Sequence, residues 1–307
     1  MILAKHRILS IVCLFIFLLP TVIHAQVSGI SISNLQIVYE PFSGLPASSG
    51  LRVSLALSDP SDSDIDEQTG TEEIRLRIRP TNNTAFVATN TTKTILPITF
   101  TSNTRGARLS LFNNEYHHDF TLRGSSGRSL SLDYLASIPA SIFAVSGLYD
   151  LSLEVDLLDL STGVPLTSTE VVDLQVLVKS KLQVNIAGAR SAAVNGVKLT
   201  TIEFDELTTD ESSRVFIQVR GNTPALITVS SENSGRLLLR DSEDIYIDYK
   251  VSVDGEVSNL ERPLKLRRLL AQDLRGTAYP MTLTVGQVEG AFSGSYQDIL
   301  TVEVRPQ

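Results

Sequence analysis

The chain has 307 residues, a formal net charge of −8 and only four histidines. An acidic balance of this size disfavours binding to nucleic acid or to anionic membrane, because both carry negative charge. The length is sufficient for two domains of ordinary size.

Residues 1–25 have the parts of a secretory signal peptide. Lys5 and Arg7 precede an apolar run that is too short to span a bilayer, and Ala25 is a small residue at which a peptidase can cut. We therefore expect an exported chain. The only cysteine, Cys13, lies in this segment, so the expected mature chain has no disulfide.

Alternating apolar residues recur from residue 27 to the end of the chain, and Gly-, Asn-, Asp- and Ser-rich turns separate them. This period of 2 predicts an all-β fold of β-sandwich domains, and the length allows two of them in tandem. In "QVSGISISNLQIVYEP" the alternation changes phase between Asn34 and Leu35. That segment is either a bulged first strand or an extension donated to a neighbour. The stretch "ERPLKLRRLLAQDLRG" fits a helix and a strand equally well.

An acidic run follows the first strands. Asp62, Asp64, Asp66 and Glu73 occupy positions 1, 3, 5 and 12 of a calcium-loop pattern, but Glu67 stands where the loop needs glycine. A solvated acidic hairpin is the favoured interpretation, with calcium binding as the alternative. We expect no cofactor and no other metal.

His117 and His118 are the only histidines of the expected mature chain. Neighbouring residues of a strand point to opposite faces, so at most one of them could line a given site. No pair of carboxylates stands out as a glycosidase pair. The sequence therefore predicts a protein without enzymatic activity.

An apolar loop precedes one strand of the first half, with Ile138, Pro139, Ile142 and Phe143 in "SIPASIFAVSG". As an exposed patch it would be a candidate binding loop for a receptor. The favoured alternative is a loop that is folded over the sandwich core.

Two apolar strands meet in "VVDLQVLVKSKLQVNIAG". We interpret the first as the closing strand of a domain spanning residues 26–178, with a candidate adhesive role. The second opens a domain spanning residues 179–307. A weak repeat supports the division, because Gly-x-Tyr precedes an alternating strand at Tyr149 and again at Tyr296. Another apolar strand follows the first copy but not the second, so we expect the C-terminal sandwich to lack its last strand.

The segment Gly294-Ser295-Tyr296-Gln297-Asp298, followed by alternating Leu300, Val302 and Val304, resembles the C-terminal strand of spore-coat-protein-U-like domains. Those domains are subunits of archaic chaperone-usher pili. The resemblance implies two immunoglobulin-like β-sandwich domains in tandem, the second of which lacks its last strand. A chaperone supplies that strand in the periplasm during assembly, and the next subunit supplies it in the pilus at the cell surface. Two-domain members of such systems are typically tip adhesins. The implied partners are a periplasmic chaperone, an usher, a neighbouring pilus subunit and a host or abiotic surface receptor.

The leading hypothesis is thus a pilus subunit of the tip adhesin type, assembled by donor-strand complementation. The expected donor-strand groove has these lining residues: Leu182, Val184, Ile186, Tyr296, Leu300, Val302 and Val304. Two alternatives remain open at this stage. One is a periplasmic pilus chaperone, and the other is a secreted β-sandwich protein that binds or hydrolyses glycans.

Overall fold

The computed structural model describes residues 27–57, 71–82, 85–103, 108–123, 129–188, 190–194 and 197–307. All regular secondary structure in these ranges is β-strand, so the prediction of an all-β fold is confirmed. No helix long and apolar enough to cross a membrane occurs in this part of the chain. The expected signal peptide lies outside the described residues.

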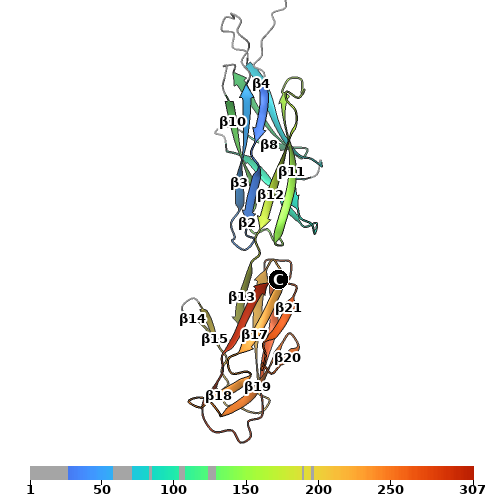
Figure 1. The fold of residues 1–307 in the computed structure, drawn as a ribbon. Coiled ribbons are helices and arrows are strands. Elements are labelled where there is room, and N and C mark those ends of the chain that lie inside the picture. The colour runs from blue at the N-terminus through green and yellow to red at the C-terminus, as the bar shows by residue number, and fades with distance from the viewer. Residues whose placement is uncertain are drawn as a thin grey trace, which may run out of the picture.

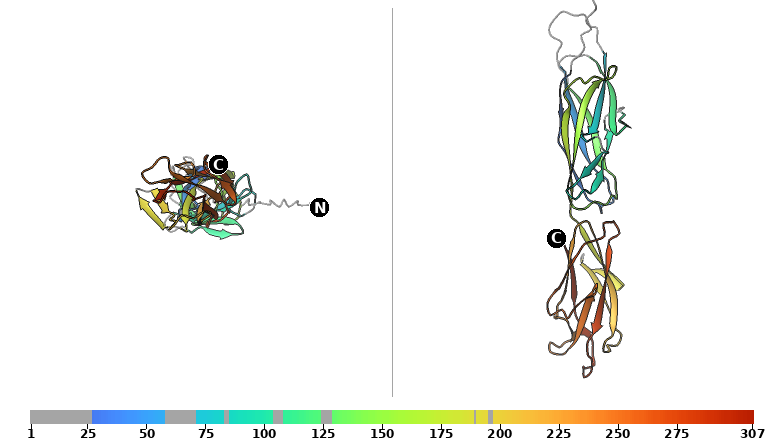
Figure 2. Two further views of the ribbon diagram at one scale, coloured as in Figure 1. Left: turned by 90° about the horizontal axis from the view of Figure 1, so that it is seen from below. Right: turned by 90° about the vertical axis from the view of Figure 1, so that its right-hand side faces the viewer.

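The strands form two groups that lie end to end along one long axis (Figures 1 and 2). The first group consists of β1 (Val27–Ile32), β2 (Leu35–Tyr39), β3 (Ala47–Leu57), β4 (Thr71–Pro80), β5 (Val87–Thr89), β6 (Ile95–Pro97), β7 (Thr99–Ser102), β8 (Ser110–Phe112), β9 (Glu115–Arg123), β10 (Ser129–Ile138), β11 (Gly147–Asp159) and β12 (Glu170–Val178). The second group consists of β13 (Leu182–Ala187), β14 (Arg190–Val194), β15 (Val197–Thr201), β16 (Ser212–Gly221), β17 (Ala225–Ser231), β18 (Arg236–Leu239), β19 (Tyr246–Val253), β20 (Glu256–Ser258), β21 (Leu264–Arg268), β22 (Thr277–Val285), β23 (Tyr296–Gln297) and β24 (Leu300–Pro306).

The first group is a sandwich of a four-stranded sheet, β1-β3-β10-β7, and an eight-stranded sheet whose main order is β2-β12-β11-β4-β9-β8. The alternating residues of β2, β4, β11 and β12 bury one face of each strand in a common core. Strand β12 pairs antiparallel with β11 and parallel with β2. This sandwich is therefore closed on the side where its first and last strands meet.

The change of phase after Asn34 has a physical cause. Strand β1 pairs with β3 in one sheet, whereas β2 pairs with β12 in the other sheet, so the chain crosses between sheets at Ser33 and Asn34. Because of this crossing, the opposite set of alternating residues faces the core in β2. A register shift does occur, but between Val27 and Gly29. Both segments lie in their own sandwich, so in this structure residues 27–39 are not an extension donated to a neighbour.

The second group is a sandwich of a seven-stranded sheet, with main order β13-β16-β22-β19-β18-β23, and a three-stranded sheet, β21-β17-β24. Its core shares no residue with the core of the first sandwich. The ambiguous stretch after Leu260 contributes strand β21, in which Leu266 is buried. The strand interpretation of that stretch is thus the correct one.

Asn222 ties the two sandwiches together. Its side-chain oxygen accepts the backbone N–H of Lys181 at 2.8 Å, and its side-chain nitrogen donates to the carbonyl of Lys179 at 2.9 Å. Its own carbonyl accepts the N–H of Ser146 from the first sandwich at 2.9 Å. Glu40 adds ion pairs to Lys179 and Lys181, at 3.7 and 3.2 Å. The joint is therefore held by bonds from both sides.

Replacing Asn222 by Ala leaves the part-buried N–H of Lys181 and carbonyl of Lys179 without their side-chain partner. We expect the free energy of unfolding of the second sandwich to fall by about 1–3 kcal/mol. Urea unfolding followed by circular dichroism measures the change. Asn103→Ala is the control, because Asn103 is exposed. Equal effects of the two substitutions would contradict this role of Asn222.

His118 is buried in the core of the first sandwich, where its Nδ1 lies 2.6 Å from the Tyr134 hydroxyl. Burial lowers the pKa of His118, and the nearby Asp119 carboxylate offsets this only in part. An unfolded histidine has a pKa of about 6.5. Below that pH the unfolded chain binds more protons than the folded chain, so the stability conferred by a neutral His118 is lost as the pH falls.

His118→Phe removes this titration. We expect the unfolding free energy of the first sandwich to fall with pH below about 6.5 in the natural chain, with a slope of at most about 1.4 kcal/mol per pH unit for one proton. In the variant this part of the slope disappears. His117→Gln, in which the half-buried neighbour is changed, keeps it. Urea titrations between pH 5 and pH 8 test both, and an unchanged slope in His118→Phe would refute the assignment.

Candidate functional site

Each sandwich contains the same tyrosine bond. The Tyr149 hydroxyl donates to the carbonyl of Val145 at 2.9 Å, and the Tyr296 hydroxyl donates to the carbonyl of Phe292 at 2.8 Å. Both are bonds to the backbone four residues upstream, as in the tyrosine corner that precedes strand F of immunoglobulin-like sandwiches. The glycine two residues before each tyrosine has a positive φ, which a residue with a side chain adopts only with strain.

The tyrosine corners make β11 and β23–β24 equivalent strands of the two sandwiches. In the first sandwich the apolar side chains of β11 are covered by β12, whose inward residues Val172, Leu174, Val176 and Val178 are at most 4% exposed. In the second sandwich β24 pairs only with β17 among the described residues. Its other edge is not hydrogen-bonded to any strand in that part of the chain.

Strand β24 lies beside β13, the edge strand of the opposite sheet (Figure 1). We call this pair of unpaired edges the β13/β24 edge. Its inward side chains are packed against the core but are only half-buried: Leu182 and Ile186 from β13, and Leu300, Val302 and Val304 from β24. Val184, between Leu182 and Ile186 on the same face of β13, is 44% exposed.

Six of the seven residues expected in the donor-strand groove are therefore brought together at this edge. Tyr296 lies apart from them. It is half-buried, belongs to the short strand β23, and pairs with Leu239 of β18. It belongs to the tyrosine corner that precedes β24 in the chain.

Asp298 fixes the start of β24, a role that sequence reasoning missed. Its carboxylate accepts hydrogen bonds from the hydroxyls of Ser231 and Tyr249, both at 2.5 Å, and from the N–H of Asn233 at 3.1 Å. Burial raises the pKa of Tyr249, and its bond to Asp298 raises it further. The only signal in the sequence was the spacing of Asp298 after Tyr296, which does not reveal the partners.

The candidate binding loop is folded over the core at the joint. Of its four apolar residues, Ile138 is buried, Ile142 and Phe143 are half-buried, and Pro139 is exposed, as are the adjoining Ala140 and Ser141. The Tyr39 hydroxyl donates to the carbonyl of Ile142 at 2.7 Å and accepts its N–H at 3.0 Å. The loop ends at Ser146, which bonds to Asn222 of the second sandwich. Three of the four apolar residues of the loop thus pack against the protein, as expected for a loop folded over the core, and a receptor role of the loop stays a prediction.

Several titratable groups of the first sandwich are paired with one another. His117 lies 3.0 Å from Glu115, and His118 faces the opposite side, as expected for neighbours in a strand. Asp156 is buried and bonded by Arg77 at 2.7 Å. Asp62, Asp64 and Asp66 lie outside the described residues, and Glu73 is an exposed residue of β4. Among the described residues no group of three or more potential metal ligands occurs.

No protein-family model matches the chain, and no curated protein matches it. Among solved structures, the chain is similar to the chaperone–tip adhesion subunit pre-assembly complex CsuC–CsuE of Acinetobacter baumannii. That match has 14% identity and a TM-score of 0.44, and covers 90% of this chain and 99% of the other. It is also similar to the CupB6 tip adhesin of Pseudomonas aeruginosa, with 10% identity, a TM-score of 0.40, and coverage of 91% and 95%.

The adhesive subunit CfaE of CFA/I fimbria from enterotoxigenic Escherichia coli is a further neighbour. Its identity is 13% and its TM-score 0.33, with coverage of 81% of this chain and 76% of that one. At these identities and TM-scores the likenesses assign no family. The function proposed below rests on the geometry of the chain itself.

Asp298→Ala leaves four donors without this acceptor at the start of β24, because the N–H of Ile299 also donates to the Asp298 carboxylate at 2.7 Å. We expect the free energy of unfolding of the second sandwich to fall by about 2–4 kcal/mol, because two of those donors are hydroxyls bonded to a charged carboxylate. Urea unfolding measures the change. Asp248→Ala is the matched control, since the side chain of Asp248 is 73% exposed and its nearest cation lies 3.7 Å away. A loss no greater than that of the control would show that Asp298 does not anchor the strand.

Proposed function

We propose that the β13/β24 edge accepts a strand from another protein, and that the chain is a non-enzymatic subunit of an exported pilus. In this proposal residues 179–307 form the strand-accepting domain and residues 26–178 form a complete outer domain with an adhesive role. The observation that carries the proposal is the difference between the two sandwiches. Strand β11 of the first sandwich is covered by β12, whereas its equivalent in the second sandwich, β24, keeps half-buried apolar side chains.

The chemistry of the edge fits an extended apolar peptide. Leu300, Val302 and Val304 alternate along β24, so an added strand would place every second side chain against the core. The free backbone groups of β24 would supply the main-chain hydrogen bonds that fix its register. Further burial of the half-exposed apolar side chains, each worth up to about 1.5–3 kcal/mol when fully buried, would supply the affinity.

The first sandwich also indicates the direction of the missing strand. Strand β12 runs antiparallel to β11 and parallel to β2, the strand that opens its sheet. By the same arrangement the added strand runs antiparallel to β24 and parallel to β13. It would then begin near the joint and leave at the far pole of the second sandwich, opposite the first sandwich (Figure 1). A neighbouring subunit attached at that pole leaves the first sandwich at the outer end.

This arrangement supports a tip position, with a periplasmic chaperone, an usher and the next subunit as partners. A chaperone role for the chain itself would require it to donate a strand. The described strands at the joint and in the first sandwich are paired within their own sheets, and the open edge has the character of an acceptor.

Supplying the strand in the same chain tests the proposal. We attach a short glycine-rich turn and a second copy of Glu170–Val178 after Gln307, because this segment closes the first sandwich. The transition of the second sandwich in calorimetry is expected to rise by at least about 10 °C, since several kcal/mol of apolar burial is gained. The control carries Leu174→Asp and Val176→Asp within the attached copy. Equal stabilisation by the control, or none by either, contradicts the proposal.

Val184→Asp provides a second arm of the same test. Because Val184 is 44% exposed, the substitution is expected to change the unfused chain by no more than about 0.5 kcal/mol. In the fused chain it places a charge beneath the added strand and removes at least half of the stabilisation. Val257→Asp, at a position 66% exposed on β20, leaves the stabilisation intact.

A further inference from the structure

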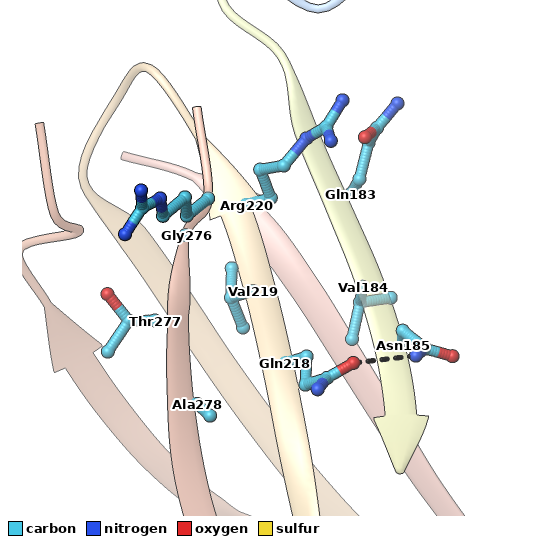
Figure 3. Close-up of a pocket in the computed structure, with 10 residues that line it drawn as sticks. Gln183, Val184, Asn185, Gln218, Val219, Arg220, Gly276, Thr277 and Ala278 are labelled. Atoms are coloured by element: carbon cyan, nitrogen blue, oxygen red, sulfur yellow. Dashed lines mark hydrogen bonds between the residues drawn. The ribbon is translucent and has the colours of Figure 1, made fainter. Parts of the chain in front are cut away.

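A polar pocket lies on the outer face of the second sandwich, on the side of its sheet away from the core. It has a volume of about 420 Å³, within the range of small-molecule sites. Strands β13, β16 and β22 form its floor and walls. Figure 3 shows Gln183 and Arg220 on neighbouring strands at one end, and Gln218 bonded to Asn185 below them.

The pocket follows from the side chains that these strands carry outward. Gln183 stands opposite Arg220, and Asn185 stands opposite Gln218, so two polar rows cross β13 and β16. The row of Gln218 continues into Ala278 of β22, and Gly276 precedes that strand; both residues are small and leave the space open. A Cβ at Gly276 would lie 2.5 Å from the carbonyl oxygen of Val219, so this close approach requires glycine.

Two arginines line the pocket without a carboxylate in ion-pair contact among the described residues. The Nε of Arg220 is buried and has no hydrogen-bond partner there, although its guanidinium lies 5.0 Å from the centre of the Phe42 ring. Arg275 stands beside Asp273, whose carboxylate accepts the backbone N–H groups of Arg275 and Gly276. Those bonds lower the pKa of Asp273, and the charge of Arg275 contributes less.

A buried guanidinium N–H without an acceptor is costly, and a planar carboxylate is the acceptor that guanidinium groups match best. The amides around it can donate to and accept from hydroxyl groups. In the next row along the same face, Phe216 is 39% exposed and stands opposite Pro280, which gives the polar rows an apolar margin.

We propose that this pocket binds an acidic saccharide, with a sugar carboxylate held by Arg220 and Arg275 and sugar hydroxyls held by Gln183 and Gln218. Val184 of the β13/β24 edge also lines the pocket, but the polar side chains that would hold the saccharide lie on the opposite face of the sheet from the half-buried apolar side chains of that edge. The variants that remove saccharide binding therefore differ from those that block strand addition, and either function can fail in experiment without the other.

The test uses the purified full chain and tri-galacturonate, with binding measured by isothermal titration calorimetry. We expect saturable binding that weakens with added salt, because the attraction is between charges. Arg220→Gln and Arg275→Gln are each expected to weaken it about tenfold or more. Ala278→Leu, which fills the pocket without removing a charge, is expected to abolish it. Arg214→Gln is the matched control, since Arg214 is exposed on the same face of β16 and outside the pocket.

Two comparison ligands decide the chemical class. Maltotriose, which has hydroxyls and no carboxylate, is expected not to bind, and acetate alone is expected to bind at least about a hundredfold more weakly than tri-galacturonate. Absence of tri-galacturonate binding, or binding that Arg275→Gln and Ala278→Leu leave unchanged, overturns the proposal. Tighter binding of a hexa-aspartate peptide than of the trisaccharide would replace the saccharide by an acidic protein segment.

Discussion

The two sandwiches differ in whether a further strand covers one edge of the core. In a sandwich whose strands alternate apolar and polar residues, the core must be shielded from water at the edge strands of each sheet as well as at the central strands. In the first sandwich β12 does this, lying between β11 and β2 and contributing four fully buried side chains. In the second sandwich the corresponding position, between β24 and β13, is occupied by none of the described strands, and the core there stays half-exposed.

Local devices hold the incomplete edge in place. The tyrosine corner at Tyr296 and the carboxylate of Asp298 fix the path of the chain just before β24 begins. Strand β17 then pairs with β24 along its whole length, from Ser231 opposite Leu300 to Ala225 opposite Pro306. The edge is thus ordered within the chain itself, which lowers the conformational entropy cost of adding the proposed strand.

The alternation of residues was enough to predict the all-β fold and to place the apolar residues of β12, β13 and β24. A period of 2 is a local property that each strand carries in its own sequence. In the sequence, the passage of the chain from the sheet of β1 to the sheet of β2 is visible only as a change of phase in the alternation. A bulge and a crossing between sheets both reverse which residues face the core, so the change of phase does not distinguish them.

Pairing between segments far apart in the sequence was harder to predict. Nothing in the sequence around Asp298 identifies Ser231 or Tyr249 as its partners. Arg220 and Arg275 line one pocket only because β16 lies beside β22, which begins two residues after Arg275. The loop at Ile138 also required the structure, since its apolar residues fit a buried and an exposed position equally well.

The direction of the strands relative to the long axis has a mechanical consequence. Both sandwiches lie end to end, and β17 and β24 run approximately along the line that joins them (Figure 1). A pull along that line loads the hydrogen bonds between β17 and β24 in shear, so that all of them resist together. A pull across the strands would open the same bonds one at a time. With Asn222 and the Glu40 ion pairs bridging the joint, the chain is arranged to transmit tension from one pole to the other.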